Sequence, residues 1–189
     1  MCTAFSPELV DAVDPYVSVH KIASSDLCYR ELLERVRDKG RPILLSVGGS
    51  NIGDIELALD ILQTGPAPIV LMYCVSAYPS RYYNLFQMEK LATRFGLPVG
   101  LSDHYVDVYY PALSAVKHFG AIVIEKHVNF YQMQLTPDSY HSVTGVEFQY
   151  MCDMLRGKRN AEEFQPQPEE AGMFLRHNRR LIATRDIAR

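Results

Sequence analysis

The feature that most constrains the fold of this 189-residue chain is a series of five short apolar runs, each followed by an amphipathic segment. The runs are rich in β-branched and aliphatic residues, which is typical of parallel strands covered on both faces. They span residues 17–23, 42–47, 68–75, 98–102 and 121–127. Their starts lie roughly 23 to 30 residues apart, as successive strand–helix units require.

The amphipathic segments predict helices over residues 26–39, 51–63, 84–95, 109–119 and 145–156, with one more over 7–14 ahead of the first run. Ser25 or Asp26 is the expected N-cap of the first of the five. Gly96 and Gly120 each follow a helical segment and precede the next apolar run by a few residues. Glycine at these points is typical of a helix end that leads into a strand.

An alternation of strands and helices forms either an open doubly wound sheet or a closed barrel, and periodicity alone does not separate them. Polar residues gather at the C-terminal end of all five runs, where barrel enzymes place their chemistry, whereas an open sheet uses one switch point. The chain also lacks the glycine-rich nucleotide motifs. We therefore predict an α/β fold of the TIM (β/α)8-barrel type.

A complete barrel of eight units needs about 200 to 250 residues, so we expect this one to be incomplete, with about the last five to six units. Residues 1–160 are predicted to form the partial barrel, and residues 161–189 a linker and a tail with a strand-like segment at 179–183. Either the chain is a fragment or another chain supplies the missing wall, and we favour the fragment.

Composition narrows the class of protein. The net charge is −3, from 19 basic and 22 acidic residues that are mixed along the chain, which argues against nucleic acid as a partner. The four cysteines have neither paired nor zinc-ligand spacing, so we expect reduced thiols. The apolar runs are too short to span a bilayer, and the first residues do not form a signal peptide. We expect a cytoplasmic protein without a membrane partner.

His104 and His127 stand at the ends of the last two apolar runs. Two imidazoles on neighbouring strands can bind one transition-metal ion and leave positions open for water and substrate. The alternative is that each ring only makes a hydrogen bond at the barrel rim. Because two histidines occur at neighbouring strand ends, each beside a carboxylate, we favour the metal site.

The other strand ends offer one cation and several hydroxyl groups, namely Lys21, Ser24, Ser46, Ser76 and Ser102. A lysine ammonium surrounded by hydroxyl donors is suited to a phosphate and a carboxylate. Any single serine here fits a turn or a helix cap better than a ligand-binding role. The set of four favours an anion site.

Three carboxylates near these positions have two interpretations each. Asp138 follows a proline and either accepts hydrogen bonds from sugar hydroxyls or forms an ordinary turn. Asp103 and Glu125 either orient the two histidines or pair with Lys126 or Lys21. The other histidines form no constellation that we interpret as functional: His20, His118, His141 and His177.

Taken together, these segments resemble the sialic acid synthase family, in order and in spacing. The motifs that carry the resemblance are Lys-Ile-Ala-Ser at 21–24, Cys-Val-Ser-Ala-Tyr-Pro at 74–79, Gly-Leu-Ser-Asp-His at 100–104, Ile-Glu-Lys-His at 124–127 and Pro-Asp at 137–138. The resemblance covers nearly the whole chain. It implies condensation of phosphoenolpyruvate with an N-acetylated hexose such as N-acetylmannosamine, with release of phosphate.

The resemblance also implies roles for individual residues. His104 and His127 would be the catalytic metal ligands for a divalent ion, most typically Mn²⁺, with Mg²⁺ or Co²⁺ as alternatives. Tyr78 and Asp138 would contact the sugar, and a homodimer is one assembly that the family implies. The residues that would hold phosphoenolpyruvate are Thr3, Lys21, Ser24, Ser46, Ser76 and Ser102.

The chain departs from the family pattern at both ends and in its loops. The first two barrel strands and the C-terminal antifreeze-like domain have no counterpart here. Tyr73 replaces a usual histidine, and Ser139 stands where a histidine often follows Pro-Asp. We therefore expect this chain to be inactive alone. The alternative function is a catalytically silent barrel remnant that binds a partner.

Overall fold

The computed structural model describes residues 1–130 and 138–157. Six strands form one parallel sheet in which neighbours in sequence are neighbours in space. They are β1 (Cys2–Thr3), β2 (His20–Ile22), β3 (Ile43–Ser46), β4 (Ile69–Tyr73), β5 (Val99–Asp103) and β6 (Ala121–Lys126). A doubly wound sheet would reverse its strand order at a switch point. The sequential order confirms the predicted barrel-type fold.

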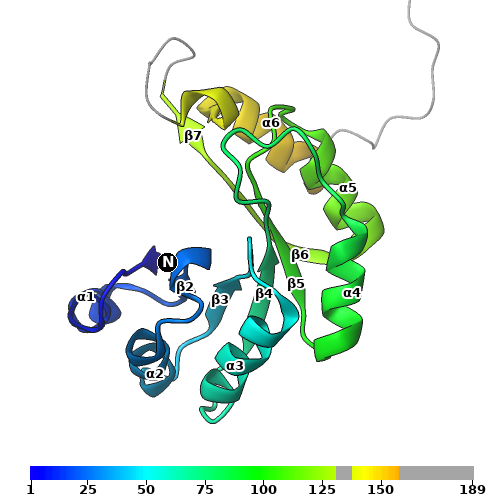
Figure 1. Ribbon diagram of the computed structural model, residues 1–189. Helices are drawn as coiled ribbons and strands as arrows, with labels where there is room; N and C mark the ends of the chain where they lie inside the picture. The colour runs from blue at the N-terminus through cyan, green and yellow to red at the C-terminus, as the bar shows by residue number, and fades with distance from the viewer. Residues whose placement is uncertain (131–137, 158–189) are drawn as a thin grey trace, which may run out of the picture.

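The strands alternate with helices that lie along the convex side of the curved sheet (Figure 1). The helices are α1 (Pro7–Val13), α2 (Arg30–Asp38), α3 (Ile52–Leu62), α4 (Phe86–Phe95), α5 (Tyr110–Phe119) and α6 (Gly145–Leu155). Within the described residues the sheet stays open between β1 and β6, so these six strands form part of a barrel wall. The predicted linker and tail at 161–189 lie outside the described residues.

Strand alternation divides the side chains of the sheet between two environments. Ile22, Leu45, Leu71 and Leu101 point outward and form a fully buried core with the helices. The alternate positions face the barrel interior, where Val70 and Val123 are only half-buried because the described wall is open. The core therefore lies between sheet and helices, and the inner face is left for chemistry.

The helix ends follow the sequence except at α2. Gly96 and Gly120 adopt left-handed φ angles of 64° and 69° and end α4 and α5 as expected. The predicted N-cap at Ser25 or Asp26 is wrong. These residues belong to the 3-10 turn η2 (Ser24–Asp26), and α2 begins at Arg30. The turn satisfies its own backbone groups and buries Leu27 before the helix starts.

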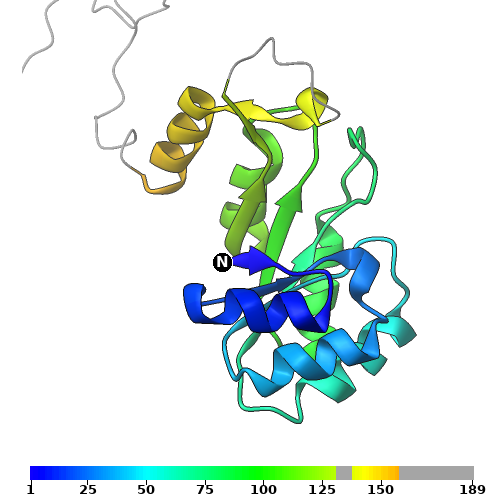
Figure 2. The ribbon, with the colours of Figure 1, turned by 90° about the vertical axis from the view of Figure 1, so that its left-hand side faces the viewer.

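Beyond β6, the chain adds a second layer at the carboxyl ends of the strands. The strands β7 (Val128–Asn129) and β8 (Val143–Thr144) pair in parallel and lead into α6 (Figure 2). The short 3-10 helix η3 (Ser139–His141) precedes β8. Among the described residues, no helix has the length and apolarity that crossing a bilayer would require.

A buried ion pair joins the outer face of β5 to that of β6. The Lys126 ammonium donates to Asp103 Oδ2 at 3.0 Å and to the Tyr105 carbonyl oxygen at 2.8 Å, and both charged side chains are fully buried. Asp103 Oδ1 in turn accepts from the Tyr105 backbone N–H. The pair therefore fixes the loop that follows β5 and the direction in which His104 leaves the strand.

Replacing Lys126 with methionine leaves the Asp103 carboxylate buried without its cation. Loss of one member of a buried pair costs about 3 to 5 kcal/mol. We expect Lys126→Met to lower the free energy of unfolding by that amount in urea titrations at pH 7, and Asp103→Asn in the same chain to recover part of it. Lys117→Met, on an exposed position of α5, serves as control. An equal loss in both lysine variants would contradict the assignment.

A second charged cluster lies at the opposite, amino-terminal end of the strands. Asp14 Oδ1 accepts from Arg41 Nε at 2.6 Å and lies 3.0 Å from Nε2 of the buried His20. The hydrogen bond from Arg41, followed by that from His20, lowers the pKa of Asp14 to about 2. His20 thus belongs to a structural cluster, remote from the strand ends that carry the predicted site.

The lowered pKa of Asp14 makes this cluster's contribution pH-dependent. Because the pKa is lower in the folded than in the unfolded chain, the stabilisation is present above about pH 4 and is lost as pH falls toward 2. The difference in unfolding temperature between wild type and Asp14→Asn should therefore be clear at pH 6 and largely lost as the pH approaches 2. Asp60→Asn, at an exposed position of α3, is the control. A difference independent of pH would refute the linkage.

Candidate active site

The carboxyl ends of the strands surround a cavity of about 450 Å³ on the inner face of the sheet. Eight of the predicted site residues line it: Lys21, Ser24, Ser46, Ser76, Tyr78, Ser102, His104 and His127. Strand alternation explains this convergence, since His104 and His127 directly follow β5 and β6 and are each two residues beyond Ser102 or Glu125. Side chains from five successive strands or their following loops thus reach one space.

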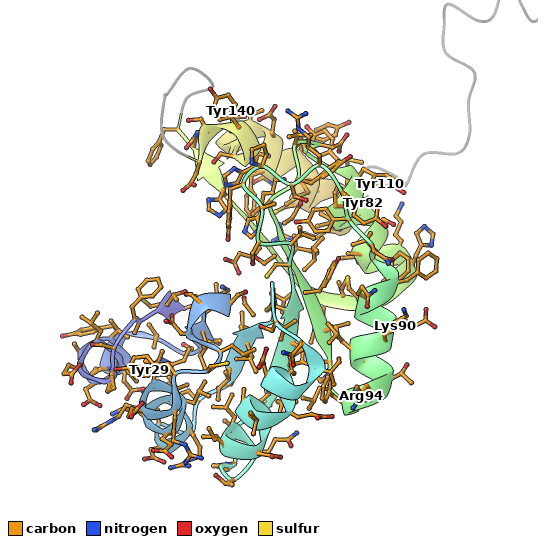
Figure 3. The ribbon with its side chains drawn as sticks, in the orientation of Figure 1. Tyr29, Tyr82, Lys90, Arg94, Tyr110 and Tyr140 are labelled. Carbon is orange, nitrogen blue, oxygen red and sulfur yellow. The ribbon has the colours of Figure 1, made fainter. Side chains whose placement is uncertain are left out.

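A larger hollow of about 890 Å³ lies on the other side of the sheet, over α4. Its walls come from Ile52 and one face of α4, where Lys90 and Arg94 extend away from the sheet (Figure 3). No strand end contributes to it. The inner cavity is therefore the one that gathers the chemistry-bearing residues.

Lys21 and Glu125 form an ion pair inside the cavity. Lys21 Nζ lies 3.3 Å from Glu125 Oε2, and the lysine side chain is 9% exposed. Ser46 Oγ is buried and has no hydrogen-bond partner among the described residues. A buried hydroxyl without a partner is costly unless a ligand or water satisfies it. This wall of the cavity therefore offers a cation and an unused donor.

Gly48 allows the neighbouring hydroxyls to converge. Its backbone N–H donates to Ser24 Oγ at 3.0 Å, and Ser24 Oγ lies 3.2 Å from Cys74 Sγ. A Cβ at Gly48 would stand 2.5 Å from both Cys74 Sγ and Ser76 Oγ, closer than side chains tolerate. Only glycine fits here without displacing the groups that line the cavity.

Two predicted residues lie outside the cavity lining. Thr3 pairs in register with Lys21 at the open edge of the sheet, on β1. Asp138 lies above the cavity, at the start of η3. Its Oδ2 atom is 3.6 Å from Nδ1 of His127, so it faces a histidine of the site.

His104 is held by the backbone and not by a carboxylate. Its Nδ1 lies 3.1 Å from the Val75 carbonyl oxygen, which can only accept, so Nδ1 carries the proton and Nε2 keeps its lone pair. The His104 backbone N–H donates to the Tyr83 hydroxyl at 2.7 Å. Burial lowers the pKa of His104, which favours the neutral ring. Asp103, one of the expected orienting groups, instead binds Lys126.

The rings of His104 and His127 lie on the same face of the sheet. Their centroids are 5.3 Å apart and their planes are inclined at 71°. The Tyr78 ring packs against both, at 4.4 Å from His104 and 6.3 Å from His127. Neutral imidazoles arranged in this way can bind one metal ion.

The sequence interpretation of His141 as outside any constellation is wrong. Its ring centroid lies 4.6 Å from that of His127 and 5.8 Å from that of His104, and its side chain is fully buried. The Val143 backbone N–H donates to the His127 carbonyl oxygen at 2.9 Å, which brings η3 over the cavity. The one sequence signal was the position of His141 three residues after Asp138, and that spacing is weak evidence alone.

The potential ligand atoms of His127, Asp138 and His141 all lie within 4.8 Å of one another. Among the described residues, this is the group of three such side chains that could hold a metal ion. His118 is exposed on α5 and takes no part in it.

Comparison with known proteins places the chain in a family. The model of the NeuB family matches residues 1–165. An uncharacterized protein of Methanocaldococcus jannaschii is 36% identical over 177 residues, which cover 90% of this chain and 52% of that protein. N,N'-diacetyllegionaminic acid synthase of Campylobacter jejuni is 33% identical, with 82% of this chain and 48% of the relative covered. The chain thus spans about half the length of the curated relatives it matches.

Solved structures agree with this assignment. The N-acetylneuraminic acid synthetase of Leptospira borgpetersenii superposes with a TM-score of 0.75 at 27% identity, over 92% of this chain and 62% of that one. A truncated 3-deoxy-D-arabino-heptulosonate 7-phosphate synthase from Thermotoga maritima, at 16% identity and a TM-score of 0.67, shares the fold. These comparisons confirm the resemblance drawn from the motifs: the chain belongs to the NeuB family.

Proposed function

We propose that this chain carries the phosphoenolpyruvate and metal portion of a nonulosonic acid synthase. The reaction is the condensation of phosphoenolpyruvate with an N-acetylated hexose such as N-acetylmannosamine, with release of phosphate. The observation that carries the proposal is that Lys21, Ser46 and the two strand-end histidines line one cavity. Relatives in the family are named legionaminic acid and pseudaminic acid synthases.

Phosphoenolpyruvate presents two anionic groups, a phosphate and a carboxylate. In the proposal, the Lys21 ammonium faces these charges, and serine hydroxyls donate to their oxygens. Glu125, 3.3 Å from Lys21, holds the ammonium at the cavity wall. The hydroxyl residues of this subsite are Ser24, Ser46, Ser76 and Ser102, with Thr3 beside Lys21 at the open edge of the sheet.

His104 and His127 would hold a divalent ion, Mn²⁺ by preference and Mg²⁺ or Co²⁺ as alternatives. The residues fit such an ion because the Val75 carbonyl fixes His104 in the tautomer with a free Nε2 lone pair. A divalent ion bound there would act as a Lewis acid on the aldehyde oxygen of the open-chain sugar. Tyr78 and Asp138, which lie beside the histidines, would contact the sugar.

The proposed condensation needs no oxidant or reductant. The methylene carbon of phosphoenolpyruvate forms the new bond to the sugar aldehyde carbon, whose oxygen becomes a hydroxyl. Water adds at the carbon of phosphoenolpyruvate that carries the phosphate oxygen. The bond from that carbon to the phosphate oxygen then breaks, which releases inorganic phosphate. The residues of this chain bind and orient the anion. Holding both reactants in one geometry is what accelerates such a step.

Because the chain spans about half of its relatives, we place the complete reaction in a chain with a fuller barrel. The proposal includes a cytoplasmic location and a homodimer as one assembly. Four free cysteines among the described residues are compatible with a reducing compartment.

The test of the function is phosphate release from phosphoenolpyruvate and N-acetylmannosamine with Mn²⁺. We expect none from this chain, and release from a chimera extended at its N-terminus with the preceding segment of the Campylobacter relative. His104→Ala in the chimera should lower the rate at least about 100-fold, because a metal ligand is lost. His118→Ala, which changes an exposed histidine, should leave it unchanged. A folded chimera that is inactive with every N-acetylated hexose would favour the alternative of a binding protein.

The anion subsite is tested separately by Gly48→Ala. The added methyl group meets Cys74 Sγ and Ser76 Oγ at 2.5 Å, so the hydroxyls must move apart. Overpacking of this kind costs about 1 to 3 kcal/mol, and we expect phosphoenolpyruvate to bind this chain about tenfold more weakly in calorimetric titrations. Gly145→Ala is the matched control, since its new methyl group would meet no atom within 4 Å. Unchanged affinity in Gly48→Ala would remove these serines from the subsite.

A further inference from the structure

His141 is a buried histidine whose ring nitrogens are both left without a hydrogen-bond partner among the described residues. Its relative exposure is 2%. Asp138 Oδ1 is 3.7 Å from Nε2 of His141, which is beyond hydrogen-bond distance. A buried polar ring without a partner costs free energy, so its position calls for a ligand.

The surroundings of His141 are those of a metal ligand. Its ring faces two other imidazoles, at 4.6 Å from His127 and 5.8 Å from His104 between centroids. Three imidazoles bound to one ion at about 2.1 Å would place their ring centroids about 4.5 to 5.3 Å apart. The observed separations of 4.6, 5.3 and 5.8 Å lie within about half an ångström of that range.

Asp138 adds an anionic oxygen to the same group. Its two carboxylate oxygens lie 3.6 Å from His127 Nδ1 and 3.7 Å from His141 Nε2. Neighbouring ligand atoms at about 2.1 Å from an ion are about 3.0 to 3.4 Å apart, so small side-chain movements would suffice. A set of two imidazoles and one carboxylate binds divalent transition metals in preference to Mg²⁺.

The backbone holds His141 in place independently of any ion. The His141 backbone N–H donates to the Asp138 carbonyl oxygen at 3.3 Å, and Ser142 Oγ donates to the same oxygen at 2.7 Å. Two residues later, β8 pairs with β7, and Thr144 caps α6. The turn is therefore fixed from both sides.

We propose that His141 is a third imidazole ligand of the ion held by His104 and His127, with one oxygen of Asp138 as a carboxylate ligand and the other left for the sugar contact. This inference rests on the proposed function only for the pair of strand-end histidines. The third imidazole makes the site selective for transition metals such as Mn²⁺, Fe²⁺, Co²⁺ or Zn²⁺ over Mg²⁺.

The test uses Co²⁺ and the full 189-residue chain. In the ¹H NMR spectrum of the Co²⁺-loaded chain, each bound histidine contributes one strongly shifted, exchangeable ring N–H signal. We expect three such signals in the wild-type chain. Two signals, assigned to His104 and His127, would overturn the proposal without any substitution.

Variants then identify the third ligand. His141→Gln, which keeps a polar side chain of similar length, should remove one shifted signal and weaken Co²⁺ binding at least about tenfold in competition with a chelator. His118→Gln, in an exposed histidine of α5, should change neither. Mg²⁺ in large excess should not displace Co²⁺ from the wild-type chain. An unchanged signal count and affinity in His141→Gln would exclude His141.

The number of shifted NMR signals does not depend on whether the chain catalyses the proposed reaction. If the extended chimera fails to release phosphate while three shifted signals are present, the three-histidine metal site is supported and the proposed reaction is contradicted. If the chimera is active and its activity depends on His104 but only two signals are seen, the reaction is supported and His141 is excluded as a ligand.

Discussion

The pairing of β5 with β6 is the interaction on which the rest of the site depends. Ser102 lies opposite Glu125 and Asp103 opposite Lys126, so neighbouring residues of each strand alternate between the two faces of the sheet. A shift of one residue would exchange the buried ion pair with the cavity-lining residues. Main-chain hydrogen bonds thus set which charges are buried against the helices and which face the cavity.

The two faces of these strands use charge in different ways. On the outer side, Asp103 and Lys126 neutralise each other and hold the loop after β5, with no exposure to solvent. On the inner side, Lys21 and Glu125 approach to 3.3 Å across the cavity, where a ligand could reach the ammonium. The outer pair therefore serves the fold, whereas the inner pair belongs to the surface where we place the anion.

Much of this arrangement was predictable from local patterns. The apolar runs and the polar residues that follow them identified the strand ends, because parallel strands all direct their carboxyl ends to one edge. His104 and Lys21 could be singled out for that reason. Val75 could not, since it orients His104 through a carbonyl oxygen that every residue possesses. His141 also escaped prediction, because its place follows from the pairing of β7 with β8 across a loop.

The sequence by itself determined the alternation of strands and helices, the parallel sheet and the set of residues at its carboxyl edge. These follow from periodicity and chain direction, which are local properties. Only the tertiary structure decided that His141 and Asp138 lie close to His127, that Asp103 binds Lys126, and that His20 belongs to a cluster with Asp14 at the opposite end. Those contacts depend on strand register and on the paths of loops. They join residues that are far apart in the sequence, so a local pattern of residue types does not predict them.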